Sequence, residues 1–263
     1  MSTLDSINGN LYSKDQNDKI YSQILQMPKP AYFVLIDPDK TGVKESLSLA
    51  VLAEQKGVDG LLIGSSLLLH DNLDNCLREM KKLVKIPIII FPGLLNTYSP
   101  LADAILFLNM ISSRNAQLLI GEQVRAAPLL KKLGLESIST AYILIESGKL
   151  TSVQYVSNSL PIPRDKPDIL IAHVLAAEYI GMKMIYLETG SGANQPVPLE
   201  MIKQVKLTTD LPIIVGGGIR KADTASEIAA VGADIIVTGT VMEDEENHQL
   251  LADFVEAIHR WRK

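Results

Sequence analysis

The sequence contains a single cysteine, Cys76, among its 263 residues. An intrachain disulfide is therefore impossible, and a cytoplasmic location is the natural expectation because stable disulfides belong to oxidising compartments. Cys76 lies in a segment patterned like a helix, so we expect an inert thiol in the core.

Clusters of basic residues are also missing. The formal net charge is -5, whereas proteins that bind phosphate backbones need clustered Lys and Arg. The short run Arg260, Arg262 and Lys263 is interpreted as a solvated helix end beside the negative pole of the helix dipole. We therefore predict that nucleic acid is not a partner.

No hydrophobic run is long enough to suggest a membrane span. The most apolar stretch, residues 169–187, is interrupted by His173, Glu178 and Lys183, and it is interpreted as a helix followed by a buried strand. The polar first 26 residues lack the apolar core of a signal peptide.

The composition is that of a globular protein, with 47% hydrophobic and 21% charged residues. The length suits one α/β barrel and allows a sizeable core. No composition shift marks a domain boundary, so we predict a single domain over residues 1–263. Residues 1–28 are expected to form an N-terminal extension that is helical.

Eight short apolar runs alternate with amphipathic stretches along the chain. Continuous apolar runs are typical of parallel strands covered on both faces. The expected strands are Tyr32–Asp37, Gly60–Gly64, Ile86–Phe91, Ala104–Leu108, Thr140–Ile145, Met184–Glu188, Ile213–Val215 and Ile235–Thr238. Helical spacing is clear in Lys44–Lys56, Leu199–Lys206, Asp223–Val231 and Leu250–Trp261. This pattern predicts an α/β fold of the (β/α)8 TIM-barrel type.

Two connections are irregular. Pro92–Asp103, between the third and fourth strands, is short and rich in Pro, Gly, Asn and Ser. It leaves little room for a crossover helix, so we predict that the third barrel helix is missing or replaced by extended chain. Ser147–Lys166 lacks helical periodicity and contains two prolines, which predicts a long loop after the fifth strand.

Active sites of such barrels lie where the strands end. The first strand ends in Asp37-Pro38-Asp39-Lys40. Its carboxylates could hold a divalent cation bound to phosphate oxygens, or the segment could be a turn with a helix cap. Asp37 is the better ligand candidate because it ends the strand, and Asp39 could cap the following helix.

The second strand ends in Gly64-Ser65-Ser66. A hydroxyl there could assist a metal or a phosphate, or it could simply cap a helix or a turn. The four histidines, His70, His173, His248 and His259, show no metal-binding spacing and are interpreted as structural or surface groups.

Glycine turns follow the last three strands. The sixth strand continues into Gly190-Ser191-Gly192, the seventh into Gly216-Gly217-Gly218, and the eighth into Thr238-Gly239-Thr240. Glycine lets backbone N–H groups approach an anion closely. Because three such turns occur at successive strand ends, we predict a phosphate site there.

Glu188 ends the sixth strand and is expected to point toward that site. A carboxylate beside a bound alcohol could act as a general base. A salt bridge with Arg220 or Lys40 is the alternative.

These motifs together resemble the geranylgeranylglyceryl phosphate synthase family, which includes the heptaprenylglyceryl phosphate synthases. The resemblance runs from about Ala31 to the C-terminus. The segments that carry it are 33–40 (FVLIDPDK), 63–66 (IGSS), 91–93 (FPG), 186–192 (YLETGSG), 215–220 (VGGGIR) and 238–240 (TGT). It implies a barrel without the third helix and a prenyltransferase that joins sn-glycerol-1-phosphate to geranylgeranyl diphosphate or a similar polyprenyl diphosphate as an ether.

The resemblance also implies roles for individual residues. Mg²⁺ is the expected cofactor, bound by Asp37 and Ser66, although Ser65 is an alternative ligand. Glu188 and Asp37 are the implied catalytic residues, Glu188 accepting the proton of the attacking hydroxyl. The implied substrate-binding residues are Tyr186, Leu187, Glu188, Thr189, Gly190, Ser191, Gly192, Gly217, Gly218, Gly239 and Thr240.

The apolar substrate tail needs a groove, which we expect in the gap left by the third helix near Phe91, Leu94 and Tyr98. The resemblance further implies a homo-oligomer and transient contact with a membrane surface. Two rival functions remain: another phosphate-binding barrel isomerase or synthase, and a non-catalytic barrel that binds flavin or phosphate.

Overall fold

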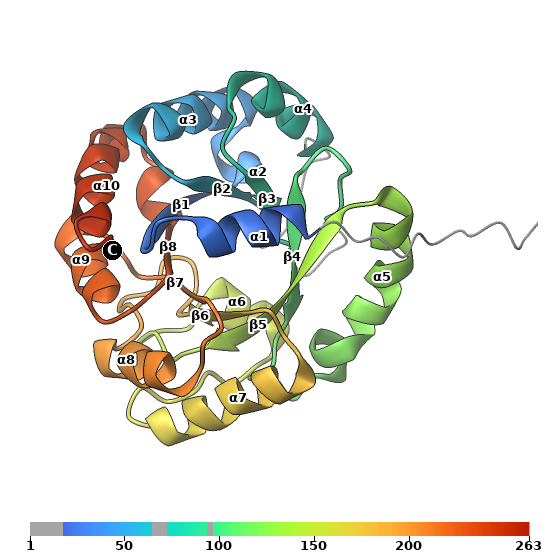
Figure 1. Cartoon of the computed structure of the whole chain (residues 1–263), viewed down its shortest axis with the longest axis vertical. Coiled ribbons are helices and arrows are strands. Elements are labelled where there is room, and N and C mark those ends of the chain that lie inside the picture. Colours follow the sequence, from blue (N-terminus) through green and yellow to red (C-terminus); the bar gives the residue numbers. More distant parts are fainter. Residues whose placement is uncertain (1–17, 65–72, 94–96, 263) are drawn as a thin grey trace, which may run out of the picture.

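Eight parallel strands form a closed barrel in the order of the sequence, and β1 pairs with β8 to close it (Figure 1). The computed structural model describes residues 18–64, 73–93 and 97–262. The strands are β1 (Ala31–Ile36), β2 (Gly60–Ile63), β3 (Ile88–Ile90), β4 (Ala104–Asn109), β5 (Glu136–Leu144), β6 (Met184–Glu188), β7 (Ile213–Gly216) and β8 (Ile235–Thr238). The predicted TIM barrel is confirmed.

Most of the helices surround the barrel, whereas α1 lies across it (Figure 1). The α-helices are α1 (Lys19–Gln26), α2 (Pro38–Thr41), α3 (Val43–Lys56), α4 (Leu73–Leu83), α5 (Glu122–Leu133), α6 (Ser152–Ser157), α7 (Pro167–Ile180), α8 (Leu199–Thr208), α9 (Ala222–Ala230) and α10 (Leu251–His259). Between β3 and β4 the described residues, 91–93 and 97–103, contain no helix. The ring of helices is accordingly interrupted between α4 and α5, as the prolines and glycine of this connection predicted.

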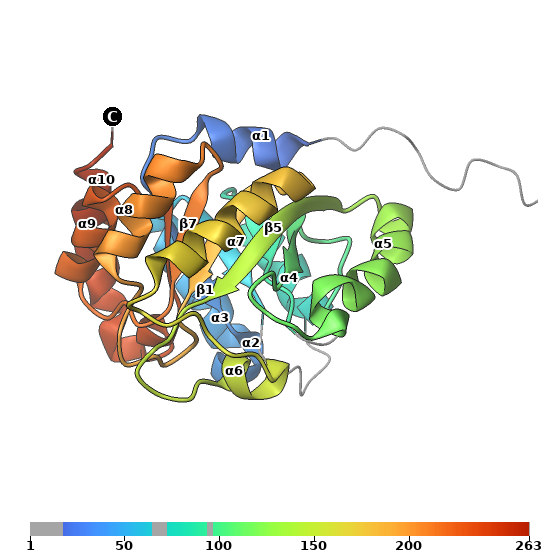
Figure 2. The ribbon, with the colours of Figure 1, turned by 90° about the horizontal axis from the view of Figure 1, so that it is seen from below.

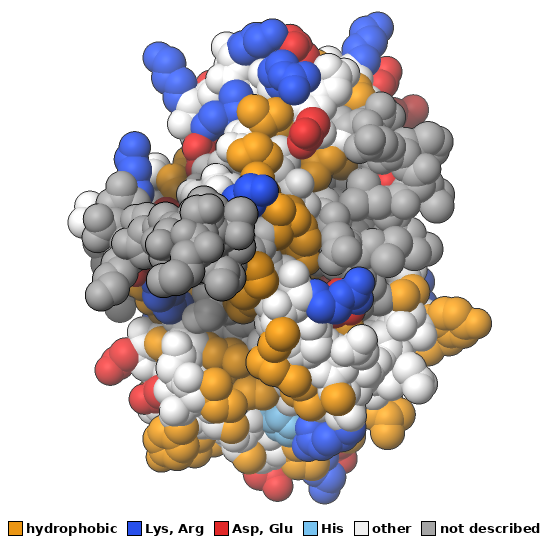
Figure 3. Space-filling model, turned by 90° about the vertical axis from the view of Figure 1, so that its right-hand side faces the viewer, with side chains coloured by type: hydrophobic (Ala, Val, Ile, Leu, Met, Phe, Trp, Pro, Cys, Tyr) orange, Lys and Arg blue, Asp and Glu red, His pale blue; other side chains and the backbone are white. Residues whose placement is uncertain are grey.

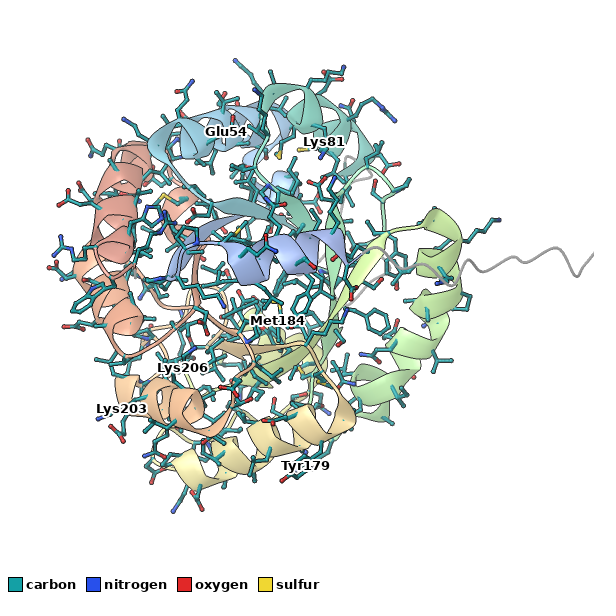
Figure 4. The ribbon with its side chains drawn as sticks, in the orientation of Figure 1. Glu54, Lys81, Tyr179, Met184, Lys203 and Lys206 are labelled. Carbon is teal, nitrogen blue, oxygen red and sulfur yellow. The ribbon has the colours of Figure 1, made fainter. Side chains whose placement is uncertain are left out.

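Side chains alternate between two cores along each strand, as the pleat of a β-strand requires. One set faces the helices and includes Ile185 and Leu187 of β6. The other set fills the inside of the barrel and includes Met184 and Tyr186 of the same strand. In Figure 4, Met184 lies in the middle of the barrel, whereas Tyr179 and Lys203 point outward from α7 and α8. By this alternation Glu188 belongs to the inward set.

Helix α1 covers the end of the barrel where the strands begin, and α6 lies at the opposite end (Figure 2). Ile20 and Ile24 pack into the interior core. Glu136, the first residue of β5, accepts the backbone N–H groups of Ile20 and Tyr21 at 2.7 Å each. It thereby satisfies donors that the start of a helix leaves without intrahelical partners.

Other carboxylates at this end also accept backbone N–H groups near strand starts. Glu54 accepts from Ile86, Asp103 from Ile88 and Asp234 from Ile213. Asp234 and Asp103 are also paired with Lys206 and Lys81. Figure 4 labels Glu54, Lys81 and Lys206 at the periphery of this end.

Asp59 is the most heavily hydrogen-bonded of these carboxylates. It accepts from the Tyr32 N–H at 2.8 Å, from His259 Nε2 at 2.9 Å and from Arg262 Nη2 at 2.5 Å. Burial alone would raise the pKa of Asp59, but these hydrogen bonds outweigh burial and lower it. The interpretation of Arg262 as part of a solvated helix end was wrong, because its guanidinium fixes the C-terminal segment to the barrel. A pair separated by 203 residues leaves no local pattern from which it could be predicted.

The connection after β5 was predicted as a long loop without a helix, and this prediction was wrong in one part. It contains the six-residue helix α6, which ends at Asn158 in the left-handed conformation (φ 48°). An isolated bridge between Ile145 and Ile162 holds the connection against the end of β5. The helix is too short for its periodicity to stand out in the sequence.

Cys76 is fully buried in α4, and burial raises the pKa of its thiol to about 11, as expected for an inert core residue. Among the described residues, no helix is long and apolar enough to cross a membrane.

Candidate active site at the carboxyl ends of the strands

A cavity opens at the end of the barrel where the strands terminate. It is lined by strand ends and glycine turns on one side, and on the other by residues that follow β3 or belong to β4 and α5. Nine of the predicted site residues line this cavity: Asp37, Tyr186, Glu188, Ser191, Gly192, Gly217, Gly218, Gly239 and Thr240. Residues from distant parts of the sequence therefore share one site.

Glu188 and Asp37 are both buried carboxylates of this site, each with 7% of its surface exposed. Burial raises the pKa of Glu188 to about 7, although the N–H groups of Gly190 and Thr189 and the hydroxyl of Tyr186 oppose that rise. The Gly190 N–H donates to Oε1 at 2.6 Å. A carboxyl with a pKa near neutrality can exchange protons with a bound alcohol.

The predicted alternative for Glu188, a salt bridge with Arg220 or Lys40, is not what the structure shows. Lys40 Nζ pairs with Glu243 Oε1 at 2.7 Å and lies 3.9 Å from Asp37 Oδ2. Arg220 donates to the carbonyl oxygens of Gly192 and Asn194. Both cations line the cavity, where they add positive charge without neutralising Glu188.

Three aromatic rings pack together in this site. Tyr186 packs against Phe91 and Tyr142, with ring centroids 5.6 and 5.5 Å apart. The Tyr186 hydroxyl is buried and has no well-formed hydrogen bond to any described residue, although its side chain lies close enough to Glu188 to affect the pKa. Tyr186 lines the cavity, and its hydroxyl is enclosed beside the Glu188 carboxylate.

Gly216 and Gly217 make room for this group. A Cβ on Gly216 would lie 2.7 Å from the Tyr186 hydroxyl and 2.9 Å from Glu188 Oε2. A Cβ on Gly217 would collide with Glu188 Oε1 and Thr189 Oγ1, and Gly217 has a φ of +83°. Both positions therefore require glycine, for close approach at Gly216 and also for conformation at Gly217.

The turns after β6 and β8 are linked through hydroxyl groups. Ser191 Oγ and Thr240 Oγ1 are 2.9 Å apart. Thr240 begins a short 3₁₀ turn, Thr240–Met242. Backbone amides of glycine turns and a helical N-terminus, together with the Arg220 guanidinium at the cavity wall, suit an anion such as phosphate.

Asp37, which was predicted to be a better metal ligand than Asp39, also caps α2. Its Oδ1 accepts from the Asp39 N–H at 3.1 Å, so the cap predicted for Asp39 is provided by Asp37. Among residues 18–64, 73–93 and 97–262, no three His, Cys, Asp or Glu side chains group as a metal site would require. Ser65 and Ser66 lie outside the described residues.

The apolar half of the cavity lies beside the interrupted part of the helix ring. Phe91, Tyr98, Leu108 and Leu118 line it, while Leu94 lies outside the described residues. Figure 3 shows hydrophobic side chains in a band down the side of the molecule that carries α5. Gln123 ties β4 to the turn before α5, because its Nε2 donates to the carbonyl oxygens of Leu108 and Leu118.

Some predicted residues do not face the cavity. Leu187 packs on the helix side of β6. Thr189 is fully buried next to Gly217, and Gly190 lies against Thr151. Conversely, Tyr142 and Gly216 were missing from the predicted site. The alternation of β5 would have placed Tyr142 on the interior face with Ile138.

A closed parallel barrel with a buried carboxylate and glycine turns at its carboxyl end defines the class of phosphate-binding TIM barrels. The model of the PcrB family matches residues 23–258 of the chain. The chain therefore belongs to the PcrB family.

Similar proteins include geranylgeranylglyceryl phosphate synthases from several organisms. The geranylgeranylglyceryl phosphate synthase of Chitinophaga pinensis is 42% identical over 246 residues, covering 92% of this chain and 97% of that protein. The one from Pyrococcus horikoshii is 43% identical over 231 residues, covering 88% and 90%. The structure of (S)-3-O-geranylgeranylglyceryl phosphate synthase from Thermoplasma acidophilum, in complex with its substrate sn-glycerol-1-phosphate, matches with a TM-score of 0.86 and 33% identity, covering 92% of this chain and 98% of that one.

Proposed function

We propose that this protein is a prenyltransferase that joins sn-glycerol-1-phosphate to geranylgeranyl diphosphate or a similar polyprenyl diphosphate, forming an ether and releasing diphosphate. The observation that carries the proposal is the position of Glu188. This buried carboxylate lines the same cavity as the glycine turns and the apolar residues of β4. The names of the relatives support the same reaction, and so does the sn-glycerol-1-phosphate bound in the Thermoplasma acidophilum structure.

The glycine turns would hold the phosphate of glycerol phosphate. Gly217 and Gly218, with Gly239 and Thr240, would surround it, and Arg220 would add positive charge. Anchoring one end of the nucleophile lowers the entropic cost of reaching the reactive carbon. The free hydroxyl would then lie near Glu188 and the Tyr186 hydroxyl.

Glu188 would accept the proton of that hydroxyl as the oxygen attacks the allylic carbon. One C–O bond forms to the glycerol oxygen, and the bond between the allylic carbon and the diphosphate oxygen breaks. A pKa of about 7 places the carboxyl near the operating pH of a general base. The aromatic rings of Phe91, Tyr142 and Tyr186 exclude water from this point.

The donor groups at the cavity mouth suit a Mg²⁺ ion that is held mainly by substrate phosphates and water. Asp37 alone is too little for an all-protein cage, but Mg²⁺ commonly uses one or two carboxylates with substrate phosphates and water. Asp37, with a hydroxyl from Ser65 or Ser66, would hold the ion. When bound, it supplies positive charge that stabilises the departing diphosphate.

The apolar half of the cavity would receive the prenyl chain. Phe91 and Tyr98 line it, as expected from the sequence. A homo-oligomer and a cytoplasmic location stay predictions.

The role of Asp37 can be tested against its neighbour. Ether formation from the two substrates is measured as a function of Mg²⁺ concentration for wild type, Asp37→Asn and Asp39→Asn. Asparagine preserves the helix cap, so we expect Asp37→Asn to fold, to lose about 10²-fold in activity or more, and to need more Mg²⁺. Asp39→Asn should behave like wild type. Equal activity of both variants, or full activity in a chelator, would contradict the metal role.

A further inference from the structure

The first residues of the connection after β5 pack onto the turn after β6. A Cβ on Gly190 would lie 2.5 Å from Thr151 Oγ1, and a Cβ on Gly148 would lie 3.7 Å from Gln195 Nε2. Helix α6, which follows directly, stands at the end of the barrel opposite α1 (Figure 2). Residues 147–151 therefore contact a turn that lines the cavity mouth.

Hydrogen bonds within this segment fix the backbone of Lys149. The Ser147 hydroxyl donates to the Lys149 carbonyl oxygen at 2.5 Å and accepts the Lys149 N–H at 3.3 Å. Ser147 and Thr151 are buried, whereas Lys149 between them is exposed. The fold therefore holds the Lys149 backbone in place, while its long side chain can adjust to a ligand.

The Lys149 ammonium lies beside the glycine turn. Its Nζ is 3.9 Å from the position that a Cβ on Gly192 would occupy. Gly192 lines the cavity, and its carbonyl oxygen accepts a hydrogen bond from Arg220 Nη2 at 3.2 Å. Two cations from different connections therefore flank the same glycine at the edge of the predicted phosphate site.

Lys40 and Arg220, which line the cavity, are already engaged. Lys40 Nζ pairs with Glu243 Oε1 at 2.7 Å, and the Arg220 guanidinium donates to two carbonyl oxygens. Within the part of the chain that the structure describes, no carboxylate forms an ion pair with Lys149, the exposed Glu146 included. Lys149 can therefore bind an anion without first losing an ion pair.

The charge of the cavity favours a further cation at its mouth. The charged side chains that line it among the described residues are Asp37, Lys40, Glu122, Glu188, Arg220 and Glu243. Four of them are acidic and two are basic, and residues 244–246 continue the acidic run after Glu243. Both proposed substrates are anions, so an added positive charge beside the glycine turns would favour their binding.

We propose that Lys149 is a further binding residue for the phosphate of sn-glycerol-1-phosphate, its ammonium donating to phosphate oxygens beside Gly192. The inference rests on the proposed function and deepens it. The lysine ammonium is a compact charge with three donors on a flexible stem, which suits a phosphate at the edge of a site. Because it contacts the phosphate and not the reacting hydroxyl, it strengthens binding and leaves the chemical step unchanged.

Calorimetric titration with sn-glycerol-1-phosphate, without a prenyl substrate, tests the contact directly. Wild type is compared with Lys149→Met, which removes the charge and keeps most of the stem, and with Lys149→Arg, which keeps the charge. The matched control is Lys166→Met, because Lys166 belongs to the same connection and is also exposed. Each protein is titrated at low and at high KCl concentration.

We expect Lys149→Met to raise the Kd about fivefold to tenfold at low salt. Lys149→Arg and Lys166→Met should stay within about twofold of wild type. The difference between Lys149→Met and wild type should shrink at about 1 M KCl, because salt screens exposed charges. Equal Kd values for Lys149→Met and wild type, or equal losses at both lysines, would overturn the inference.

Ether synthesis separates binding from a structural role. In Lys149→Met the KM for sn-glycerol-1-phosphate should rise by the same factor as the Kd, with kcat and the KM for the prenyl diphosphate unchanged. A fall in kcat, or a rise only in the KM for the prenyl diphosphate, would overturn the assignment of Lys149 to the glycerol phosphate.

The two proposals can fail separately. Ether synthesis by wild type, with Lys149→Met unchanged in Kd and KM, overturns the role of Lys149 and leaves the proposed function. Binding of sn-glycerol-1-phosphate that depends on Lys149, without ether synthesis from a polyprenyl diphosphate of any length, supports the role and removes the proposed function. Folded wild-type protein that does not bind sn-glycerol-1-phosphate overturns both.

Discussion

The carboxylates at the two ends of the barrel have contrasting environments. Where the strands begin, Asp59 and Glu136 accept several hydrogen bonds each and fix one segment to another. Where the strands end, Glu188 is buried with a raised pKa beside a Tyr186 hydroxyl that lacks a well-formed hydrogen bond to any described residue. An ion-paired carboxylate such as Asp59 stabilises the fold, whereas a buried carboxylate held by neutral donors keeps a raised pKa and the capacity to react. The same barrel thus separates stability from chemistry.

Among the substitutions that test this comparison, we expect the largest effect on activity at Glu188. We expect Glu188→Gln to lower kcat about 10²- to 10⁴-fold, because the amide cannot accept the proton. The variant should remain folded, since glutamine has nearly the same shape. Steady-state ether synthesis measures the loss, and full activity of the variant would remove Glu188 from the reaction.

The pH dependence of stability sharpens the same point. The pKa of Glu188 is raised from 4.5 to about 7 in the folded protein. Its contribution to stability is therefore fully present below pH 4.5 and is lost as the pH rises through 7, a change of about 3 kcal/mol. Urea unfolding at pH 5 and pH 8 should show a smaller decline for Glu188→Gln than for wild type. Parallel declines would contradict the raised pKa.

A methyl group at Gly217 should damage both stability and activity. We expect Gly217→Ala to lower the free energy of unfolding by about 2–4 kcal/mol, from strain at positive φ and from the collision with Glu188. Gly134→Ala is the matched control, because Gly134 also has positive φ (+65°) but has no atom within 4 Å of an added Cβ. It should cost about 1 kcal/mol and leave ether synthesis unchanged. Equal effects at both positions would show that the collision is unimportant.

The opposite pattern is expected at Asp59. Asp59→Asn should lower the free energy of unfolding by about 1–3 kcal/mol, a range reduced for the partial exposure of the ion pair. Because the pKa of Asp59 is lowered from 3.8 in the folded protein, this stabilisation is present above pH 4 and is lost on acidification. Ether synthesis per folded molecule should not change. A fall in kcat at constant stability would contradict the separation of the two ends.

The barrel itself was predictable because its strands are continuous apolar runs and its turns have distinctive residues. The absence of a helix from the described residues between β3 and β4 was also predictable, since Pro92 and Gly93 disfavour one. The site followed in outline because parallel strands bring Asp37, Glu188 and Gly217 to one end. The contacts that decide their chemistry did not follow, because they depend on packing between distant segments.

Gly216 shows what could not be predicted from the sequence. In the sequence it is one of three glycines, and only the structure shows that it makes room for Tyr186 and Glu188. Likewise, Arg262 carries no local sign that it meets Asp59. Pairing across the chain is invisible to periodicity and turn patterns.

The most direct test of the account is the transfer of labelled sn-glycerol-1-phosphate into a product that an organic solvent extracts. Wild type is incubated with Mg²⁺ and geranylgeranyl diphosphate, beside Glu188→Gln and beside a sample without the prenyl substrate. The account predicts extractable label with wild type, almost none with the variant and none without the prenyl substrate. Folded wild-type protein that produces no extractable label with polyprenyl diphosphates of any length would contradict it.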